Sequence, residues 1–396
     1  MNLPYCPMCL GPIAQEALGW ICLRPHIEGQ PTKKNDGPTS SPGDRALFKK
    51  RDQNQQPDQI LRQDQLGIHN PNLCRQYNRS SEKKCTSETC GNAPRDVKFS
   101  SPACPHSTCQ EELPFQANLF SQTITLTGLR AVGKTHYLIA LDDWWTEYLP
   151  LFGLLATKVM KKEVAKAFDQ MAADLRSGQS SPAVTLPGMR LPYAWQIARS
   201  DFLGYDQPGL LCAMPDVSGE DLVDFEVLRR NHYYQYSSGI ILLLDGASIA
   251  ASRNDPEARV QLNRERALVT AMIQYLRHQR RSHEFDLLPV AICVNKIDLL
   301  IHDPRWERIV REHRPQHQRG VDLETCEATS IKIENLLSTL PETKAIVSLI
   351  QGAFPRHMFF TVATLGSDEG PRCYRPRCVE DPFLWLLYHM SMIDEC

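Results

Sequence analysis

GLRAVGKT, residues 128–135, decides the fold of this chain of 396 residues. It satisfies the pattern G-x-x-x-x-G-K-[ST], in which the N–H groups of a glycine-bounded loop surround phosphate oxygens. Gly128 and Gly133 allow the loop to turn, and Lys134 is expected to reach the outer phosphates. The hydroxyl of Thr135 can ligate Mg²⁺. The stretch therefore predicts a loop that binds a nucleoside polyphosphate.

The flanking sequence supplies the context that this pattern requires. Residues 121–128, SQTITLTG, predict a strand, and residues 135–149, THYLIALDDWWTEYL, have apolar side chains at helical spacing. A strand, a loop and a helix in this order place the loop at a helix N-terminus, where the backbone dipole favours an anion. The alternative is a glycine-bounded turn with an incidental lysine, and it leaves this agreement between motif and context unexplained.

The rest of the chain predicts an α/β fold. Four later apolar runs are typical of buried parallel strands: GLLCAM (209–214), GIILLLD (239–245), LPVAICVNK (288–296) and HMFFTVAT (357–364). Helical segments separate most of these strands. One predicted helix carries a single apolar stripe made of Met160, Val164, Phe168, Met171 and Leu175. Alternating strands and helices predict a three-layer fold with a mostly parallel sheet and ligands at the carboxyl ends of its strands.

A second candidate motif follows the run at 209–214. Asp216 lies just beyond the predicted strand, and a carboxylate there can hold Mg²⁺ directly or through water. Gly219 is placed for its N–H to face a γ-phosphate, which would make it sensitive to hydrolysis. The next residue is Glu220, where Ras-type enzymes have a glutamine that orients water, so the mechanism of hydrolysis is open. By itself D-x-x-G is a weak pattern, and an ordinary loop is the alternative.

The run at 288–296 leads into a third motif, Asn295-Lys296-Ile297-Asp298. The carboxylate of Asp298 can accept hydrogen bonds from both N1–H and N2–H of guanine, a pair of donors that adenine lacks. Asn295 is expected to brace the loop, and Lys296 to lie along the base. The alternative is a polar turn that closes a buried strand. This motif favours GTP over ATP.

With the three motifs in this order, the chain resembles the translation-factor-related (TRAFAC) class of P-loop GTPases. It resembles more closely the bacterial double-GTPase type, in which a zinc-ribbon module precedes one GTPase domain. ATLG, residues 363–366, is similar to the family's loop over guanine, although Ala363 replaces its serine, and VEDPFLWLLYHM (379–390) is similar to its terminal helix. The resemblance implies the following nucleotide contacts: Gly128, Gly133, Lys134, Thr135, His136, Asp216, Asn295, Lys296, Asp298 and Thr364.

Catalysis is expected to involve Lys134, Gly219 and Glu220, with Thr135 and Asp216 as magnesium ligands. A further magnesium ligand, a first-switch threonine, is expected between the long helix and the strand that precedes Asp216. Thr185 is the threonine in that interval, and its alternative role as an ordinary loop residue has equal weight.

The N-terminal part of the chain has a different composition. Eight of the 14 cysteines precede residue 110, in a stretch that predicts little regular structure. The interval of about 29–70 is rich in Gly, Pro, Gln and charge and resembles a flexible insertion. These features predict a cysteine-rich module at 1–115 and a nucleotide-binding domain at 116–396.

The cysteine spacing predicts about two structural zinc ions. Cys6 and Cys9 have the spacing of a zinc knuckle and are paired here with Cys22 and Cys74. A second site would use Cys85, Cys90, Cys104 and Cys109, from two similar four-residue loops. His26 and His106 are rival ligands, and scattered reduced thiols are the alternative to both sites. Cys212 and Cys293 are expected in the core, and Cys373 and Cys378 lack a second pair.

Composition sets the remaining expectations. The net charge is −2, so no global basicity draws the chain to nucleic acid, and no apolar stretch predicts a membrane span or a signal peptide. A cytoplasmic GTP-binding switch is therefore expected, which hydrolyses GTP to GDP with Mg²⁺ and docks a protein partner through its zinc module. The alternatives are a non-hydrolysing scaffold and a nucleic-acid-associated NTPase. A homodimer is a further expectation, and the resemblance implies an operon-linked role, with bacterial conflict or antiviral defence systems as its setting.

Overall fold

The structure is a computed structural model, and it describes residues 19–22, 77–78, 100–103, 120–160, 162–178, 193–199, 209–214, 234, 237–366 and 374–396. These residues belong to two compact units. The described residues of the larger unit lie in Leu119–Met160 and Ala167–Cys396, and those of the smaller unit lie in Ile13–Asn118 and Lys161–Lys166.

The smaller unit contains a three-stranded antiparallel sheet. Its strands are β1 (Gly19–Cys22), β2 (Tyr77–Asn78) and β3 (Ser100–Ala103), in the order β2-β1-β3. More than 50 residues of sequence separate β1 from β2, so this sheet joins distant segments of the chain. Cys22 is the last residue of β1, and the other seven predicted zinc ligands lie outside the described residues.

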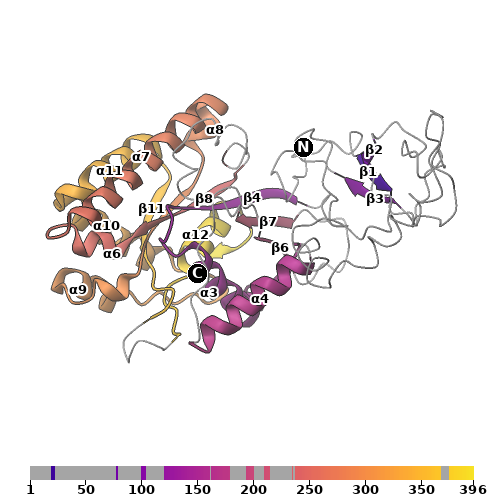
Figure 1. Ribbon diagram of the computed structural model, residues 1–396, viewed down its shortest axis with the longest axis horizontal. Helices are drawn as coiled ribbons and strands as arrows, with labels where there is room; N and C mark the ends of the chain where they lie inside the picture. Colours follow the sequence, from indigo (N-terminus) through magenta and orange to yellow (C-terminus); the bar gives the residue numbers. More distant parts are fainter. Residues whose placement is uncertain are drawn as a thin grey trace, which may run out of the picture. The chain divides into compact units, whose positions relative to one another are not determined.

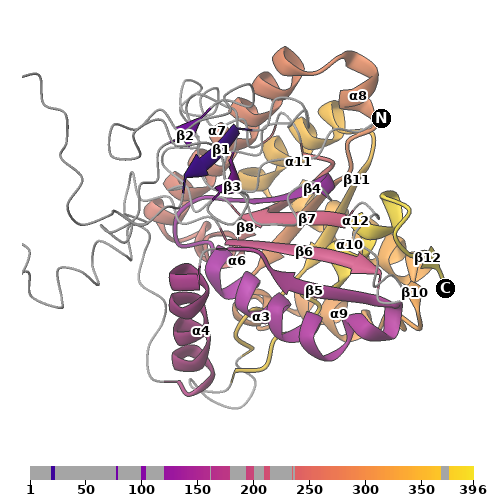
Figure 2. The same ribbon diagram turned by 90° about the vertical axis from the view of Figure 1, so that its right-hand side faces the viewer.

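The larger unit is built on a seven-stranded sheet in the order β11-β9-β8-β4-β7-β6-β5 (Figures 1 and 2). β4, β7, β8, β9 and β11 are parallel, and β6 is antiparallel to both of its neighbours. The strands are β4 (Phe120–Thr127), β5 (Leu154–Lys158), β6 (Tyr193–Arg199), β7 (Gly209–Met214), β8 (Gly239–Asp245), β9 (Val290–Asn295) and β11 (His357–Thr361). A short parallel pair is formed by β10 (Gly320–Val321) and β12 (Asp394–Glu395).

Helices lie on both faces of this sheet, which accounts for the continuous apolar sequences of β8 and β9. Figure 1 shows α7, α10 and α11 on one side and α3, α4 and α12 on the other. The helices are α3 (Lys134–Glu147), α4 (Lys162–Arg176), α6 (Gly246–Ala251), α7 (Pro256–Gln279), α8 (Ser282–Asp286), α9 (Pro304–Glu312), α10 (Leu323–Thr339), α11 (Pro341–Ala353) and α12 (Asp381–His389), with 3₁₀ turns η5 (Leu149–Phe152) and η7 (Ile297–Leu299). No helix in the described residues is long and apolar enough to cross a membrane.

An aromatic cluster fills the face that α3, α4 and α12 cover. The ring centroid of Trp145 lies 5.4 Å from that of Trp195 and 5.1 Å from that of Phe383. Phe168 also contacts Trp195, with ring centroids 5.2 Å apart. The indole N–H of Trp195 donates to Oδ1 of Asp142 at 2.8 Å, so this buried ring has a polar partner. The cluster ties the helix that follows the phosphate loop to the sheet and to α12.

Candidate nucleotide-binding site

The predicted phosphate loop lies at the carboxyl end of β4. β4 is the central strand of the sheet, with β8 on one side and β7 on the other. The strands that follow β4 directly in sequence lie on one side of it, and the later strands lie on the other side, so the strand order reverses at β4. Open α/β sheets bind ligands at such a point. α3 begins at Lys134, and its first N–H groups therefore face the loop. The topology and the helix dipole both favour an anion here.

Two glycines allow the loop its path. Gly133 has φ +95°, and a Cβ there would lie 2.6 Å from Nδ2 of Asn295. Gly128 has φ +152°, and its Cβ would lie 2.9 Å from the carbonyl oxygen of Leu243 in β8. Residues that carry a side chain rarely adopt these backbone conformations, and neither position has room for a Cβ. The glycines at the two fixed positions of the motif are therefore required by both conformation and space.

Lys134 folds back over its own loop. Its Nζ donates to the carbonyl oxygens of Gly128 and Leu129, each at 2.8 Å. The ammonium group therefore lies beside the loop backbone. Thr135 follows in the first turn of α3 and is half-buried.

Asn295 joins the third motif to the phosphate loop. It is the last residue of β9 and is fully buried. Its Nδ2 donates to the carbonyl oxygen of Val132 at 2.7 Å, and its Oδ1 accepts from the backbone N–H of Lys296 at 2.8 Å. One amide thus satisfies a loop carbonyl and also fixes the turn that follows it, which holds the two motifs in one rigid arrangement.

Lys296 occupies a left-handed conformation, with φ +58°. Its Nζ lies 2.8 Å from Oδ1 of Asp245, the last residue of β8, which pairs in register with Asn295. Asp245 also accepts from the hydroxyl of Ser248 at 2.7 Å and caps α6. The side chain of Lys296 is therefore held by a carboxylate from the neighbouring strand. Sequence reasoning did not include Asp245, although a charged residue at the carboxyl end of a buried strand is the signal that could have identified it.

Glu265, in α7, is a buried carboxyl group next to this pair. Its Oε1 accepts from the backbone N–H of Asp245 at 3.0 Å, and in the described part of the chain Oε2 has no hydrogen-bond partner. Burial, and to a lesser degree the charge of Asp245, raises the pKa of Glu265 to about 8. Its carboxyl group is therefore mostly protonated near neutral pH, so Asp245 and Lys296 form the charged pair. Sequence reasoning missed this residue, which lies in an ordinary helical pattern.

His136 follows Thr135 in α3. Its Nε2 is buried and has no hydrogen-bond partner among the described residues. Burial lowers the pKa of His136, and the positive charge of Lys296 lowers it further. The imidazole is therefore neutral near pH 7, consistent with its place at the N-terminal end of a helix dipole.

The 363–366 loop lies beside the third motif. Ile297 N–H donates to the carbonyl oxygen of Val362 at 3.2 Å, and Thr364 is buried with its hydroxyl close to the position of Gly133. Asp298, half-buried in η7, lines a small pocket together with Ala363 and other residues. The structure therefore brings Asn295, Lys296, Asp298 and Thr364 to the same edge of the sheet as the phosphate loop.

Four predicted site residues, Thr185, Asp216, Gly219 and Glu220, lie outside the described residues. β7 ends at Met214, two positions before Asp216, and is parallel to β4. The chain therefore leaves β7 at the same edge of the sheet as the phosphate loop. Thr185 belongs to the interval between α4 and β6.

Comparisons with known proteins give only distant structural likenesses. No protein-family model and no curated protein matches the chain. Three solved structures are similar to part of it: a signal recognition particle receptor SRb-GTP/SRX complex from Chaetomium thermophilum (TM-score 0.30, 13% identity, 63% of this chain and 94% of that chain), an Arl6 BBS3 small GTPase from Trypanosoma brucei with bound GppNp (0.28, 14%, 68% and 97%), and a GTP-bound Ski7 GTPase-like domain from S. cerevisiae (0.30, 12%, 68% and 50%). TM-scores of this size carry no functional argument.

Proposed function

We propose that the chain binds guanine nucleotide with Mg²⁺ at the carboxyl end of β4 and hydrolyses GTP to GDP as a molecular switch. The observation that carries this proposal is the buried hydrogen bond from Asn295 to the carbonyl oxygen of Val132. This hydrogen bond fixes the position of the proposed base-binding residues relative to the proposed phosphate-binding loop. A nucleotide spans the interval between these two groups.

Guanine selectivity is assigned to Asp298. Its carboxylate only accepts hydrogen bonds when ionised, and guanine presents two adjacent donors, N1–H and N2–H. Adenine presents an unprotonated N1 and no 2-amino group, so it would leave the carboxylate unsatisfied, which is costly in a partly buried site. Lys296, positioned by Asp245, would lie along the base, with Thr364 beside it.

Hydrolysis is assigned to groups around the loop. The hydroxyl of Thr135 and the carboxylate of Asp216 are hard oxygen donors, the kind that Mg²⁺ prefers, with Thr185 as a further candidate. Magnesium would neutralise charge on the β- and γ-phosphates. Lys134 would stabilise the same developing charge, Gly219 would contact the γ-phosphate, and Glu220 would orient the attacking water.

The zinc module is proposed to dock a protein partner. About two zinc ions bound by Cys6, Cys9, Cys22, Cys74, Cys85, Cys90, Cys104 and Cys109 would stabilise a segment with little apolar sequence, consistent with its cysteine spacing. Switch loops around Thr185 and Gly219 would change shape with the nucleotide and alter a partner surface, or a surface for a second copy of the chain. A cytoplasmic location is proposed from the sequence composition, and a role in a bacterial conflict or defence system is proposed from the family resemblance.

The second candidate function is a nucleotide-bound scaffold that does not hydrolyse GTP. Glu220 favours it, because a carboxylate replaces the amide that orients water in Ras-type enzymes. Single-turnover measurements, with and without high protein concentration, distinguish the two: a switch converts bound GTP to GDP and loses this activity in Lys134→Ala, whereas a scaffold retains GTP. A nucleic-acid-associated NTPase would instead bind DNA or RNA in a salt-dependent way at low ionic strength.

The decisive experiment for base recognition exchanges donor and acceptor on the protein. Fluorescent GTP, ATP and xanthosine triphosphate are titrated into the wild type, Asp298→Asn and the exposed control Asp286→Asn, with Mg²⁺. We expect the wild type to bind GTP in preference to ATP. Asp298→Asn should lose at least about tenfold in GTP affinity, because each hydrogen bond to a charged group contributes about 1.5–3 kcal/mol.

The same variant should gain affinity for xanthosine triphosphate. Xanthine replaces the 2-amino donor of guanine with a carbonyl acceptor, which matches the NH₂ and carbonyl groups of asparagine. Asp286→Asn should behave as the wild type. Equal binding of ATP and GTP by the wild type, or an Asp298→Asn variant that binds all three nucleotides as the wild type does, would contradict the assignment of Asp298.

A further inference from the structure

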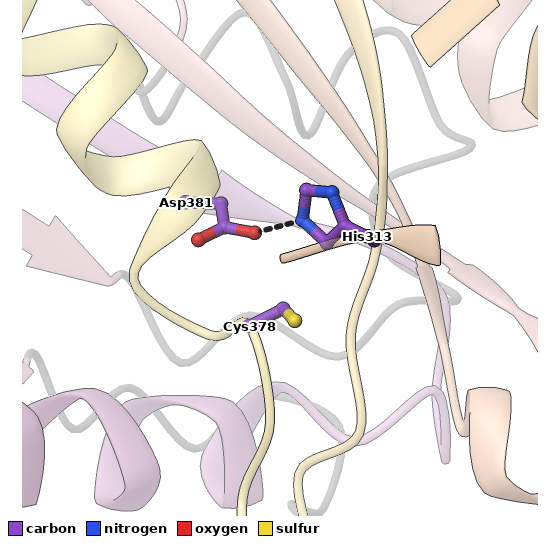
Figure 3. A group of neighbouring side chains, drawn as sticks. All are labelled: His313, Cys378 and Asp381. Carbon is purple, nitrogen blue, oxygen red and sulfur yellow. Dashed lines mark hydrogen bonds and ion pairs between the residues drawn. The ribbon is translucent and has the colours of Figure 1, made fainter. Parts of the chain in front are cut away.

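A group of buried ligand-type side chains borders the small pocket that Asp298 also lines. Among the described residues, His313, Cys378 and Asp381 bring one ligand atom each to within 4.8 Å of one another. His313 follows α9, Cys378 lies in the segment before α12, and Asp381 is the first residue of α12. Figure 3 shows the three side chains as neighbours, with the contact between His313 and Asp381 drawn as a dashed line. His313 supplies one nitrogen donor from more than 60 positions before Cys378 and Asp381, which supply one sulfur and one oxygen donor.

His317 fixes one oxygen of the carboxylate. Its Nδ1 accepts from the backbone N–H of Asp322 at 3.1 Å, so that nitrogen carries no proton. Its Nε2 must then carry the proton, which it donates to Oδ1 of Asp381 at 3.0 Å. This imidazole therefore occupies Oδ1 of Asp381, and Oδ2 is the oxygen that contacts His313. Outer partners of this kind orient ligating carboxylates in metal sites.

His313 is supported in the same way. Its Nε2 lies 2.5 Å from Oδ2 of Asp381, and its Nδ1 lies 3.0 Å from the hydroxyl of Thr329 in α10. A hydroxyl can donate to or accept from this nitrogen. If a cation replaces the proton between Nε2 and Oδ2, the ring can carry its proton on Nδ1 and donate it to Thr329. The surroundings therefore permit the tautomer that a metal ligand requires.

We propose that His313 Nε2, Cys378 Sγ and Asp381 Oδ2 bind one Zn²⁺ ion. Zinc accepts nitrogen, thiolate and carboxylate ligands together, and tetrahedral bond lengths place such ligand atoms roughly 3.3–3.6 Å apart. The 2.5 Å between His313 Nε2 and Asp381 Oδ2 would therefore widen when the ion replaces the proton, while all three ligand atoms already lie within 4.8 Å of one another. The side chains of His313 and Asp381 are 3% and 1% exposed, so little water competes for the ion. Three protein ligands leave the fourth position for water.

The ion would cross-link three parts of the larger unit. It joins the end of α9, the segment 374–380 and the start of α12. That segment also pairs with the 363–366 loop, because Ala363 and Arg377 exchange backbone hydrogen bonds. Zinc binding would therefore stabilise the loop segment and α12 as one body.

The first test measures zinc content by elemental analysis after purification of the full chain without chelator. The variants are Cys378→Ser and the control Cys396→Ser, which changes an exposed cysteine outside the cluster. We expect Cys378→Ser to contain about one zinc ion per chain less than the wild type, and Cys396→Ser to contain the same amount. Because the comparison is a difference, zinc bound by N-terminal cysteines does not affect it. Equal zinc content in all three proteins would overturn the proposal.

The second test uses the wild type and does not depend on the folding of a variant. Thiols are alkylated with and without a zinc chelator, and Cys378 is identified by mass spectrometry of its peptide. Bound zinc should protect Cys378 from alkylation, and chelation should increase its labelling rate at least about tenfold, whereas Cys396 should label at the same rate in both conditions. A Cys378 labelling rate that the chelator does not change, under conditions in which zinc is removed, would overturn the site.

Discussion

Asn295 makes the most consequential single contact of the candidate site. Its amide donates to the carbonyl oxygen of the fully buried Val132. Asn295→Ala would leave this carbonyl without its partner, which costs about 1–3 kcal/mol. We expect a loss of this size in the free energy of unfolding, measured by urea denaturation, together with weaker GTP binding in a titration. Asn254→Ala, at an exposed turn, should change neither quantity; a stable Asn295→Ala variant with wild-type affinity would show that the contact is dispensable.

Gly133 allows a sharper test at the same scale. An alanine there would combine a left-handed φ of +95° with a Cβ 2.6 Å from Nδ2 of Asn295. Gly153 also has a left-handed φ, +70°, but its Cβ would meet nothing within 4 Å. Gly153→Ala therefore isolates backbone strain, which costs on the order of 1 kcal/mol. We expect Gly133→Ala to destabilise the protein more than Gly153→Ala does, and to abolish GTP binding, which fluorescence titration measures. Equal effects of the two substitutions would show that the close approach of Asn295 is unimportant.

At the scale of elements, α7 places the carboxyl group of Glu265 in a buried position against the end of β8. The pKa of Glu265 is about 8 in the folded protein and 4.5 as its ordinary value. Because the folded state binds this proton more tightly, Glu265 contributes stability that is fully present below about pH 4.5 and is lost as the pH rises towards about 8. Each unit of pKa shift corresponds to about 1.4 kcal/mol, so the total loss is a few kcal/mol.

Glu265→Gln removes this titration and retains an oxygen that accepts from Asp245. We expect the variant to be more stable than the wild type at about pH 8 and closer to it at about pH 5.5, as measured by urea denaturation at both values. Glu327→Gln, on an exposed position of α10, serves as the control and should show the wild-type pH dependence. The same pH dependence in Glu265→Gln as in the wild type would contradict the role of Glu265.

The sequence predicts most of these elements, and its omissions have physical causes. β4, α3, β7, β8, β9 and β11 lie where apolar runs and helical spacing predict them. The sequence does not predict β5, because this edge strand is short and its residues, LLATK, do not alternate as their burial does: Leu154 is buried and Leu155 is exposed. β6 carries a mixed sequence, YAWQIAR, whose burial depends on α3 and α4 rather than on its own pattern.

The candidate site also contains residues that the sequence predicts and residues that it does not predict. The phosphate loop and the Asn295 motif are local patterns, so their residues can be identified by spacing alone. Asp245 and Glu265 become part of the site through tertiary contacts with Lys296 and with each other. The approach of His313 to Asp381 likewise crosses 68 residues of sequence. No local spacing encodes such contacts, which is why sequence reasoning gave Cys378 no partners.

At the scale of the whole molecule, ligand binding should raise thermal stability. A ligand that binds only the folded state stabilises it by about 2.7 kcal/mol when present at 100 times its Kd. Magnesium with GTP should therefore raise the Tm of the full chain, and magnesium with ATP at the same concentration should raise it less. Differential scanning fluorimetry measures both, with Asp298→Asn as the matched variant. An equal shift with ATP and GTP would argue against guanine selectivity.

The order of strands in the sheet has a consequence for how the protein reaches its native state. β4 leads into the phosphate loop, yet its neighbour β8 lies 115 residues further along the chain, as the contact between Thr123 and Ser238 shows, and the brace from Asn295 to Val132 spans 163 residues. During synthesis, the loop sequence therefore emerges well before the strands that hold it. Contacts at such separation slow folding and leave apolar strands exposed in the meantime. The nucleotide site should therefore be among the last parts of the protein to form, and ligand binding should begin only after synthesis has passed β9.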